Sequence, residues 1–128
     1  MCLFKTHAFP KISRKPIIVY KIFAERGKRP KKLITPFTGY SYKIGDTIKA
    51  IKPWYYGILP CGIEEEGVHA YCSKPTELDI SIESRRKRGY YICEIPPFTP
   101  YWFGKFNQIA ASRMKIIKKF YNYGSIYQ

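Results

Sequence analysis

Two dense runs of cationic side chains give this 128-residue sequence its strongest chemical signal. Residues 26–32 hold five cations in seven positions, and residues 85–88 hold four in a row. Ammonium and guanidinium groups bind phosphate oxygens, and each neutralised phosphate releases counterions, so the binding constant falls steeply with salt. The following side chains are therefore predicted to contact a nucleic acid or an acidic protein surface: Arg26, Lys28, Arg29, Lys31, Lys32, Arg85, Arg86, Lys87 and Arg88.

Aromatic residues offer a second kind of contact, because the unpaired bases of a single strand stack on aromatic rings. Trp54, Tyr55 and Tyr56 lie in a segment interrupted by prolines and glycines, which predicts a loop, and Trp102 follows Tyr101. Tyr40, Tyr42 and Tyr101 are further candidates, and we expect two or three of the seven rings to be exposed and to anchor the partner. The chain has no aromatic signature of RNA-binding sheets, GxxG clamp, zinc-finger spacing or recognition helix, so sequence-specific readout is not expected.

The segment around His69 holds the side-chain types best suited to catalysis. His69 and Tyr71 are followed by a cysteine and a serine, and three glutamates, residues 64–66, lie just upstream. Removal of the initiator methionine would expose the thiol of Cys2 beside its own amine, as a nucleophile with its base, although the two apolar residues that follow equally predict a core strand. A catalytic site needs mutually positioned groups, so we predict a protein that is not an enzyme and needs no cofactor.

The cysteines and histidines do not have the spacing of a metal site. They form no CxxC or HxxxH pair, and such dispersed ligands are not typical of zinc sites. A cytoplasmic domain of this size does not need disulfides, so all four thiols are expected to be reduced. The residues concerned are Cys2, Cys61, Cys72 and Cys93, with His7 and His69.

Composition and charge limit the class of protein. The chain has 23 Lys and Arg against 9 Asp and Glu, a formal net charge of +14, and it is 45% hydrophobic and 17% aromatic. This predicts a folded protein with a polyanionic partner rather than a disordered basic tail. A chain of this length is expected to form one domain, residues 1–128. Without an apolar stretch of about 20 residues or a secretory signal, a cytoplasmic protein with no membrane contact is expected.

Strands are predicted to position these side chains. Residues 17–24 and 90–95 are rich in β-branched and aromatic residues, and both are predicted to be strands. Residues 40–44, 47–51 and 67–72 are further strand candidates, separated by glycine and proline.

A short helix is expected after the last of these strands. Ser73, followed by Pro75 and Glu77, is typical of a helix start. The basic segment 26–32, broken by a glycine and a proline, is predicted to form a loop. Residues 112–120 fit both a helical stripe and a strand face. The predicted class is α+β, a single compact β-rich domain with one or two short helices.

Several short motifs are distributed along the chain: Met1-Cys2-Leu3, Pro10-Lys11-Ile12, Val19-Tyr20-Lys21, Thr35-Pro36-Phe37-Thr38-Gly39-Tyr40 with Tyr42 and Gly45, Gly67-Val68-His69-Ala70-Tyr71, Cys93-Glu94-Ile95-Pro96 and Ala111-Ser112. Together they resemble short uncharacterised proteins of bacteriophages and bacterial mobile elements, a group without an established activity. The resemblance implies a β-rich domain whose last element is a strand. It also implies a bacterial host cell and a role against, or in regulating, a host nucleic-acid system.

The stretch from Gly67 to Ser73 is also similar to the Gly-x-His-x-x-Ser strand of small domains related to ADP-ribosyltransferases. That similarity implies that His69 and its neighbours line a nucleotide pocket. The chain departs from this group because it lacks the basic or histidine residue of the first strand, and because Glu94 is the sole candidate for the catalytic glutamate that the group has late in the chain.

These observations predict a small basic protein that binds RNA or a ribonucleoprotein through an electropositive face. It would inhibit or regulate a host nucleic-acid defence system by occupying its nucleic-acid or protein surface, and an acidic or RNA-binding protein surface would attract the same charge. One alternative is a small nucleotide-handling enzyme that uses His69. The other is a minor virion or packaging component.

Overall fold

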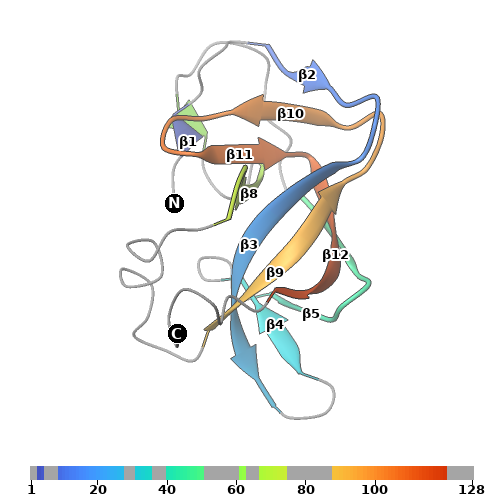
Figure 1. Ribbon diagram of the computed structural model, residues 1–128, viewed down its shortest axis with the longest axis vertical. Coiled ribbons are helices and arrows are strands. Elements are labelled where there is room, and N and C mark those ends of the chain that lie inside the picture. Colours follow the sequence, from blue (N-terminus) through green and yellow to red (C-terminus); the bar gives the residue numbers. More distant parts are fainter. Residues whose placement is uncertain are drawn as a thin grey trace.

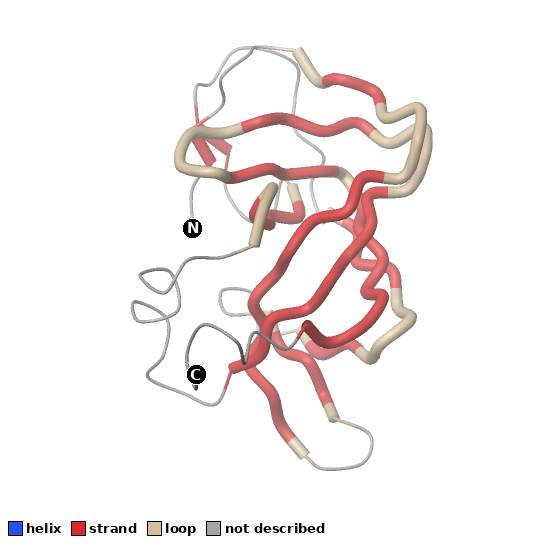
Figure 2. Tube along the Cα trace, in the orientation of Figure 1, coloured by secondary structure: helices blue, strands red, loops and turns tan. Residues whose placement is uncertain are grey.

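The computed structural model describes seven parts of the chain, and all the regular secondary structure in them is β-strand (Figure 2). The predicted α+β class with one or two short helices is wrong, because the described residues contain no helix. Within them, no helix is long and apolar enough to cross a membrane. The described residues are 3–4, 9–27, 31–35, 40–50, 61–62, 67–74 and 88–120.

Ser73, the residue predicted to start a helix, binds a turn from a distant part of the chain. It follows β8 (Val68–Tyr71), and both its hydroxyl and its backbone N–H donate to Asn107 Oδ1, at 2.9 and 3.2 Å. A serine that caps a helix instead accepts a hydrogen bond from a backbone N–H two or three residues later. The polar groups of Ser73 thus bind the turn that precedes β11 (Gln108–Ala111). The rest of the predicted helix, from residue 75, lies outside the described residues.

Strands β3 (Ile17–Arg26) and β9 (Arg88–Ile95) form the centre of the main sheet. Their antiparallel register runs from Ile17 opposite Ile95 to Ala24 opposite Arg88. Both strands were predicted, and both are confirmed, because β-branched and aromatic side chains pack well on a pleated surface. β3 extends beyond the predicted end to Arg26, so the basic segment begins inside a strand rather than in a loop.

The strand pairs of the described residues are antiparallel. The direction of the strands differs between the two ends of the main sheet (Figure 1). Figure 1 shows β10 and β11 crossing the upper part of the molecule while β3 and β9 run diagonally below them. β4 (Lys32–Ile34) pairs with the end of β3 and with β5 (Ser41–Tyr42), and β1 (Leu3–Phe4) pairs separately with β7 (Cys61–Gly62). The order across the main sheet is β2 (Lys11–Ile12), β10 (Pro100–Phe103), β11, β8, β3, β9, β12 (Arg113–Phe120) and β6 (Thr47–Lys49).

One face of the central strands carries the core, and we call it the inner face. Val19 lies opposite Cys93 on this face, and both are fully buried. The rings of Phe23 and Tyr91 meet edge to face, with centroids 5.5 Å apart. Further buried members are Leu33, Ile48, Val68, Ala70, Ile95, Ile109, Ala111, Met114 and Ile116.

β12 contains a β-bulge at Ile117. Ile116 pairs with Cys93, and the next pair joins Lys118 to Ile92, so Ile117 is an extra residue on this strand. The strand alternative for residues 112–120 is confirmed, and the bulge places Ile116 and Lys118 on opposite faces although they are two residues apart. Because side chains alternate between faces, the bulge also places Lys119 opposite Tyr91, on the inner face.

Candidate nucleic-acid interface

The opposite face of β3, β9, β12 and β6, with β4, carries exposed cations, and we call it the outer face. Directly opposed residues of antiparallel strands project to the same side. Lys115 lies opposite Glu94 and Thr47, and Lys49 lies opposite Arg113, in positions that alternate with the buried residues of the same strands. The exposed cations of the outer face are Arg26, Lys32, Lys49, Lys115 and Lys118.

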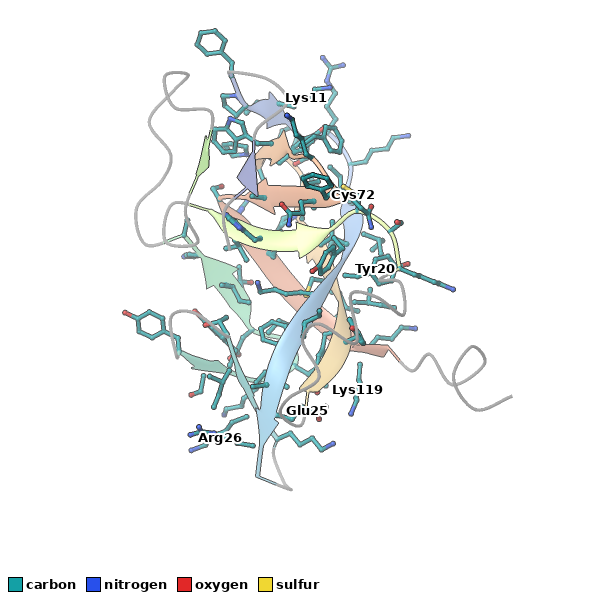
Figure 3. The ribbon with its side chains drawn as sticks, turned by 90° about the vertical axis from the view of Figure 1, so that its left-hand side faces the viewer. Lys11, Tyr20, Glu25, Arg26, Cys72 and Lys119 are labelled. Carbon is teal, nitrogen blue, oxygen red and sulfur yellow. The ribbon has the colours of Figure 1, made fainter. Side chains whose placement is uncertain are left out.

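The first basic run begins at the end of β3, and the second run ends at the start of the neighbouring strand β9. Arg26 lies opposite Lys32 on β4, both are exposed, and Figure 3 places Arg26 at the lower end of β3. Arg88, the last residue of the second run, lies on β9 opposite Ala24 of β3. Gly27 follows the last residue of β3 and has a φ of 77°, the left-handed conformation that glycine adopts without steric cost.

Lys31 has a different role from its predicted partners. Its ammonium group lies 3.0 Å from Glu25 Oε2, so this cation is bound to a side chain of the same protein. The Glu25 side chain is only 2% exposed and lies on the inner face, opposite Leu33. Of the described predicted contacts, Arg26 and Lys32 remain exposed, whereas Lys31 neutralises a buried carboxylate.

Lys119 completes this ion-pair cluster, as Figure 3 shows for Glu25 and Lys119. Its ammonium group lies 2.9 Å from Glu25 Oε1 and 3.1 Å from Oε2. Burial raises the pKa of Glu25, but the hydrogen bonds and charges of Lys119 and Lys31 outweigh it and hold the pKa below its usual value. Gly89 makes room for the carboxylate, since a Cβ atom there would clash with Glu25 and lie 3.0 Å from the Tyr91 ring.

Of the predicted aromatic rings in the described part of the chain, Tyr40 is exposed and the others are partly or fully buried. Trp102 is only 3% exposed and packs with Ala110, so its ring belongs to a small second core. Tyr101 is half-buried and meets Phe103 edge to face. The described residues hold three more exposed aromatic rings, at Phe9, Phe98 and Phe106, and the last two lie in turns.

The remaining predicted contacts lie outside the described residues, so for them the contact stays a prediction. For Arg88 the description covers the backbone alone. The residues concerned are Lys28, Arg29, Arg85, Arg86, Lys87, Trp54, Tyr55 and Tyr56, together with the catalytic candidate Cys2.

The other catalytic candidates occupy different parts of the sheet. His69 is fully buried on β8, and its backbone carbonyl accepts a hydrogen bond from Lys21 Nζ at 2.6 Å. Tyr71, also buried, lies opposite Tyr20. Glu94 lies on β9, on the far side of β3 from β8. The sheet therefore separates Glu94 from the strand that carries His69 and Tyr71.

The two described thiols, Cys72 and Cys93, are free, and burial raises the pKa of both. Cys93 is fully buried, and burial raises its pKa to about 12. Burial also raises the pKa of Cys72, whose thiol lies 3.5 Å from the backbone carbonyl of Gln108. A thiol whose pKa is raised stays protonated near neutral pH and is a poor nucleophile.

Comparison of the chain with protein-family models, with curated proteins and with solved structures finds no match.

Proposed function

We propose that this protein binds RNA, free or within a ribonucleoprotein, through the cations of its outer face. The contact would be electrostatic and independent of sequence, because ammonium and guanidinium groups recognise the phosphate backbone. Binding would act by occupancy, since the bound surface becomes inaccessible to other partners. The resemblance to bacteriophage proteins makes a nucleic-acid system of a bacterial host the expected target.

The imbalance of exposed charge supports this proposal. Of the carboxylates in the described part of the chain, Glu25 is buried between two lysines, which leaves Asp46 and Glu94 to oppose the exposed cations. Such a surface attracts polyanions. The exposed cations of the described residues are Lys11, Arg14, Lys15, Arg26, Lys32, Lys43, Lys49, Lys74, Lys105, Lys115 and Lys118.

The test is the salt dependence of binding to a fluorescein-labelled single-stranded RNA, measured by anisotropy. Each phosphate contact to a single strand contributes about −0.7 to the slope of log K against log salt. A Lys115→Glu, Lys118→Glu double variant is expected to bind more weakly and to lose about 1.4 of that slope. The matched control, Lys115→Arg with Lys118→Arg, keeps the charge and is expected to keep the slope.

A second pair of variants covers the other end of the face. Arg26→Glu with Lys32→Glu is expected to weaken binding in the same way, while Arg26→Lys with Lys32→Arg leaves it unchanged. Unchanged RNA binding after all four charge reversals would contradict the proposal. A pull-down from bacterial lysate with and without nuclease then distinguishes the targets, since a protein that stays bound after nuclease treatment is contacted directly and not through RNA.

A further inference from the structure

The turn between β9 and β10, residues 96–99, is joined to the loop between β2 and β3 by a dense set of hydrogen bonds. The Ser13 hydroxyl donates to the Pro96 carbonyl at 2.6 Å and accepts the Thr99 N–H at 2.9 Å. The Ser13 N–H donates to the Thr99 carbonyl at 3.1 Å, and the Phe98 N–H donates to the Ser13 carbonyl at 2.6 Å. The two segments lie side by side on the right of Figure 1.

Arg113 fixes the same turn from the first residue of β12. Its Nε donates to Thr99 Oγ1 at 3.0 Å, and its Nη2 donates to the Pro97 carbonyl at 3.3 Å. Because Arg113 lies opposite Lys49, the turn adjoins the cations of the outer face. Hydrogen bonds from two sides therefore hold the backbone of residues 96–99 in one conformation.

This rigid turn presents the ring of Phe98 to solvent. The side chain is 78% exposed, and the backbone φ is 59°, in a region that bulky residues rarely adopt. Neither packing nor backbone preference accounts for phenylalanine here, since glycine or asparagine would suit this backbone better and little of the ring is buried. A strained residue held in place by its surroundings is a feature of binding sites.

The chemistry around Phe98 identifies the class of ligand. Arg14 and Lys15, both exposed, follow Ser13 in the adjoining loop, and Lys49 lies opposite Arg113. A fixed aromatic ring beside several cations matches an unpaired base and its flanking phosphates, which single-strand binders recognise by stacking and charge together. Bases stacked inside a duplex cannot place a face on this ring.

We infer that Phe98 stacks on an unpaired base of single-stranded RNA, while Arg14 and Lys15 contact the adjacent phosphates. This inference rests on the proposed function and deepens it. It adds a site for the base to the phosphate contacts of the outer face, and it makes the preferred ligand single-stranded.

The experiment compares the affinities of the full chain for three probes: an oligouridine of about 15 nucleotides, an abasic oligomer of equal length and a duplex. The wild-type protein is expected to bind oligouridine most tightly. Phe98→Ala is expected to lower that affinity by about tenfold or more, without changing the affinity for the abasic oligomer or the salt slope. Phe98→Tyr keeps the ring and is expected to keep the affinity.

Two further variants separate loss of binding from loss of structure. Phe98→Gly removes the ring and suits the positive φ, so its unfolding temperature is expected to rise while its affinity for oligouridine falls. Phe106→Ala is the matched control, because Phe106 is 82% exposed with a φ of 60° in the turn at the other end of β10. It is expected to bind as the wild-type protein does.

Other outcomes distinguish this inference from the function on which it rests. If the wild-type protein binds none of the probes, the proposed function fails. If it binds oligouridine and the abasic oligomer equally, and Phe98→Ala changes neither, the proposed function stands and the stacking site is overturned. If Phe98→Ala keeps its RNA affinity but loses a protein partner in a nuclease-treated lysate, Phe98 is a protein contact and the stacking site is again overturned.

Discussion

At the scale of single residues, Glu25 makes the stability of this protein depend on pH. Its carboxylate is buried on the inner face and bound by Lys31 and Lys119, which hold its pKa below the usual 4.5. A carboxyl whose pKa is lower in the folded state contributes stability above its unfolded pKa. That contribution is lost as the pH falls through the folded pKa.

Replacing Glu25 tests this argument. Glu25→Gln is expected to lower the free energy of unfolding at neutral pH by about 2 kcal/mol, because two lysines lose a charged partner. The gap between variant and wild type is expected to close as the pH falls below 4.5, where the wild-type carboxylate takes up a proton. Urea unfolding midpoints of the two proteins, measured from neutral to acid pH, give this difference in the free energy of unfolding.

The control for this variant is Glu94→Gln, which makes the same chemical change on the outer side of the neighbouring strand. It is expected to alter the unfolding midpoint little. A gap between Glu25→Gln and wild type that stays constant down to acid pH would contradict the ion-pair account, because it would show that the loss does not depend on the charge of Glu25.

The sequence predicts the cations of the candidate interface, but it does not predict which of them are exposed and which one is bound to a carboxylate of the same protein. Arg26 and Lys32 are exposed as predicted, whereas Lys31 in the same run is bound to Glu25. A run of charges does not reveal which member has a buried partner, because that partner is brought close by strand pairing. Phe98 was missed for a related reason, since its positive φ and exposure depend on contacts with Ser13 and Arg113 from distant parts of the chain.

At the scale of elements, the bulge in β12 explains how one face of this strand supplies both apolar side chains to the core and a lysine to the ion pair with Glu25. Before the bulge, Met114 and Ile116 fill the core, and after it Lys119 reaches Glu25 from the same face. In an unbroken ladder Ile117 would take the position opposite Ile92, and Lys119 would project outward. The extra residue thus aligns the ion pair with the apolar core.

Deletion variants test this role of the bulge. Deleting Ile117 leaves Ile116 and Lys118 consecutive, opposite Cys93 and Ile92, so the ladder becomes regular with every face unchanged. Its free energy of unfolding is expected to stay within about 1 kcal/mol of wild type. Deleting Lys115 also shortens β12 by one residue, but it turns either Met114 or Ile116 away from the core and is expected to cost several kcal/mol. Thermal unfolding compares the two, and equal losses would contradict the proposed pairing.

Strands were predicted correctly where the local composition and the tertiary pairing agree. Residues 17–24 and 90–95 are rich in apolar, β-branched and aromatic residues, and they form most of β3 and β9. β10 and β11 were not predicted, because their short segments have no clear alternation and are held by pairing with each other. The capping signature at Ser73 records a local preference, and Asn107 binds the same polar groups from a distant turn, while the rest of that predicted helix lies outside the described residues.

At the scale of the whole molecule, the net charge of +14 acts on stability as well as on binding. Like charges that lie apart on the surface repel one another, and salt screens this repulsion. The screening length falls from about 30 Å at 0.01 M salt to about 10 Å at 0.1 M. The ion pairs of Glu25 are partly buried and are screened less, so the net effect of salt on the folded state is stabilising.

The unfolding temperature of the protein without RNA is therefore expected to rise between 0.01 and 0.1 M salt, as differential scanning fluorimetry can measure. Lys115→Gln with Lys118→Gln lowers the net charge from +14 by two, to +12, and is expected to show a smaller rise. Since a bound RNA strand supplies the same counter-charge, it is expected to stabilise the wild-type protein most at low salt. An unfolding temperature that does not change with salt would mean that the surface cations do not repel one another, and the electrostatic argument for a polyanionic partner would lose its support.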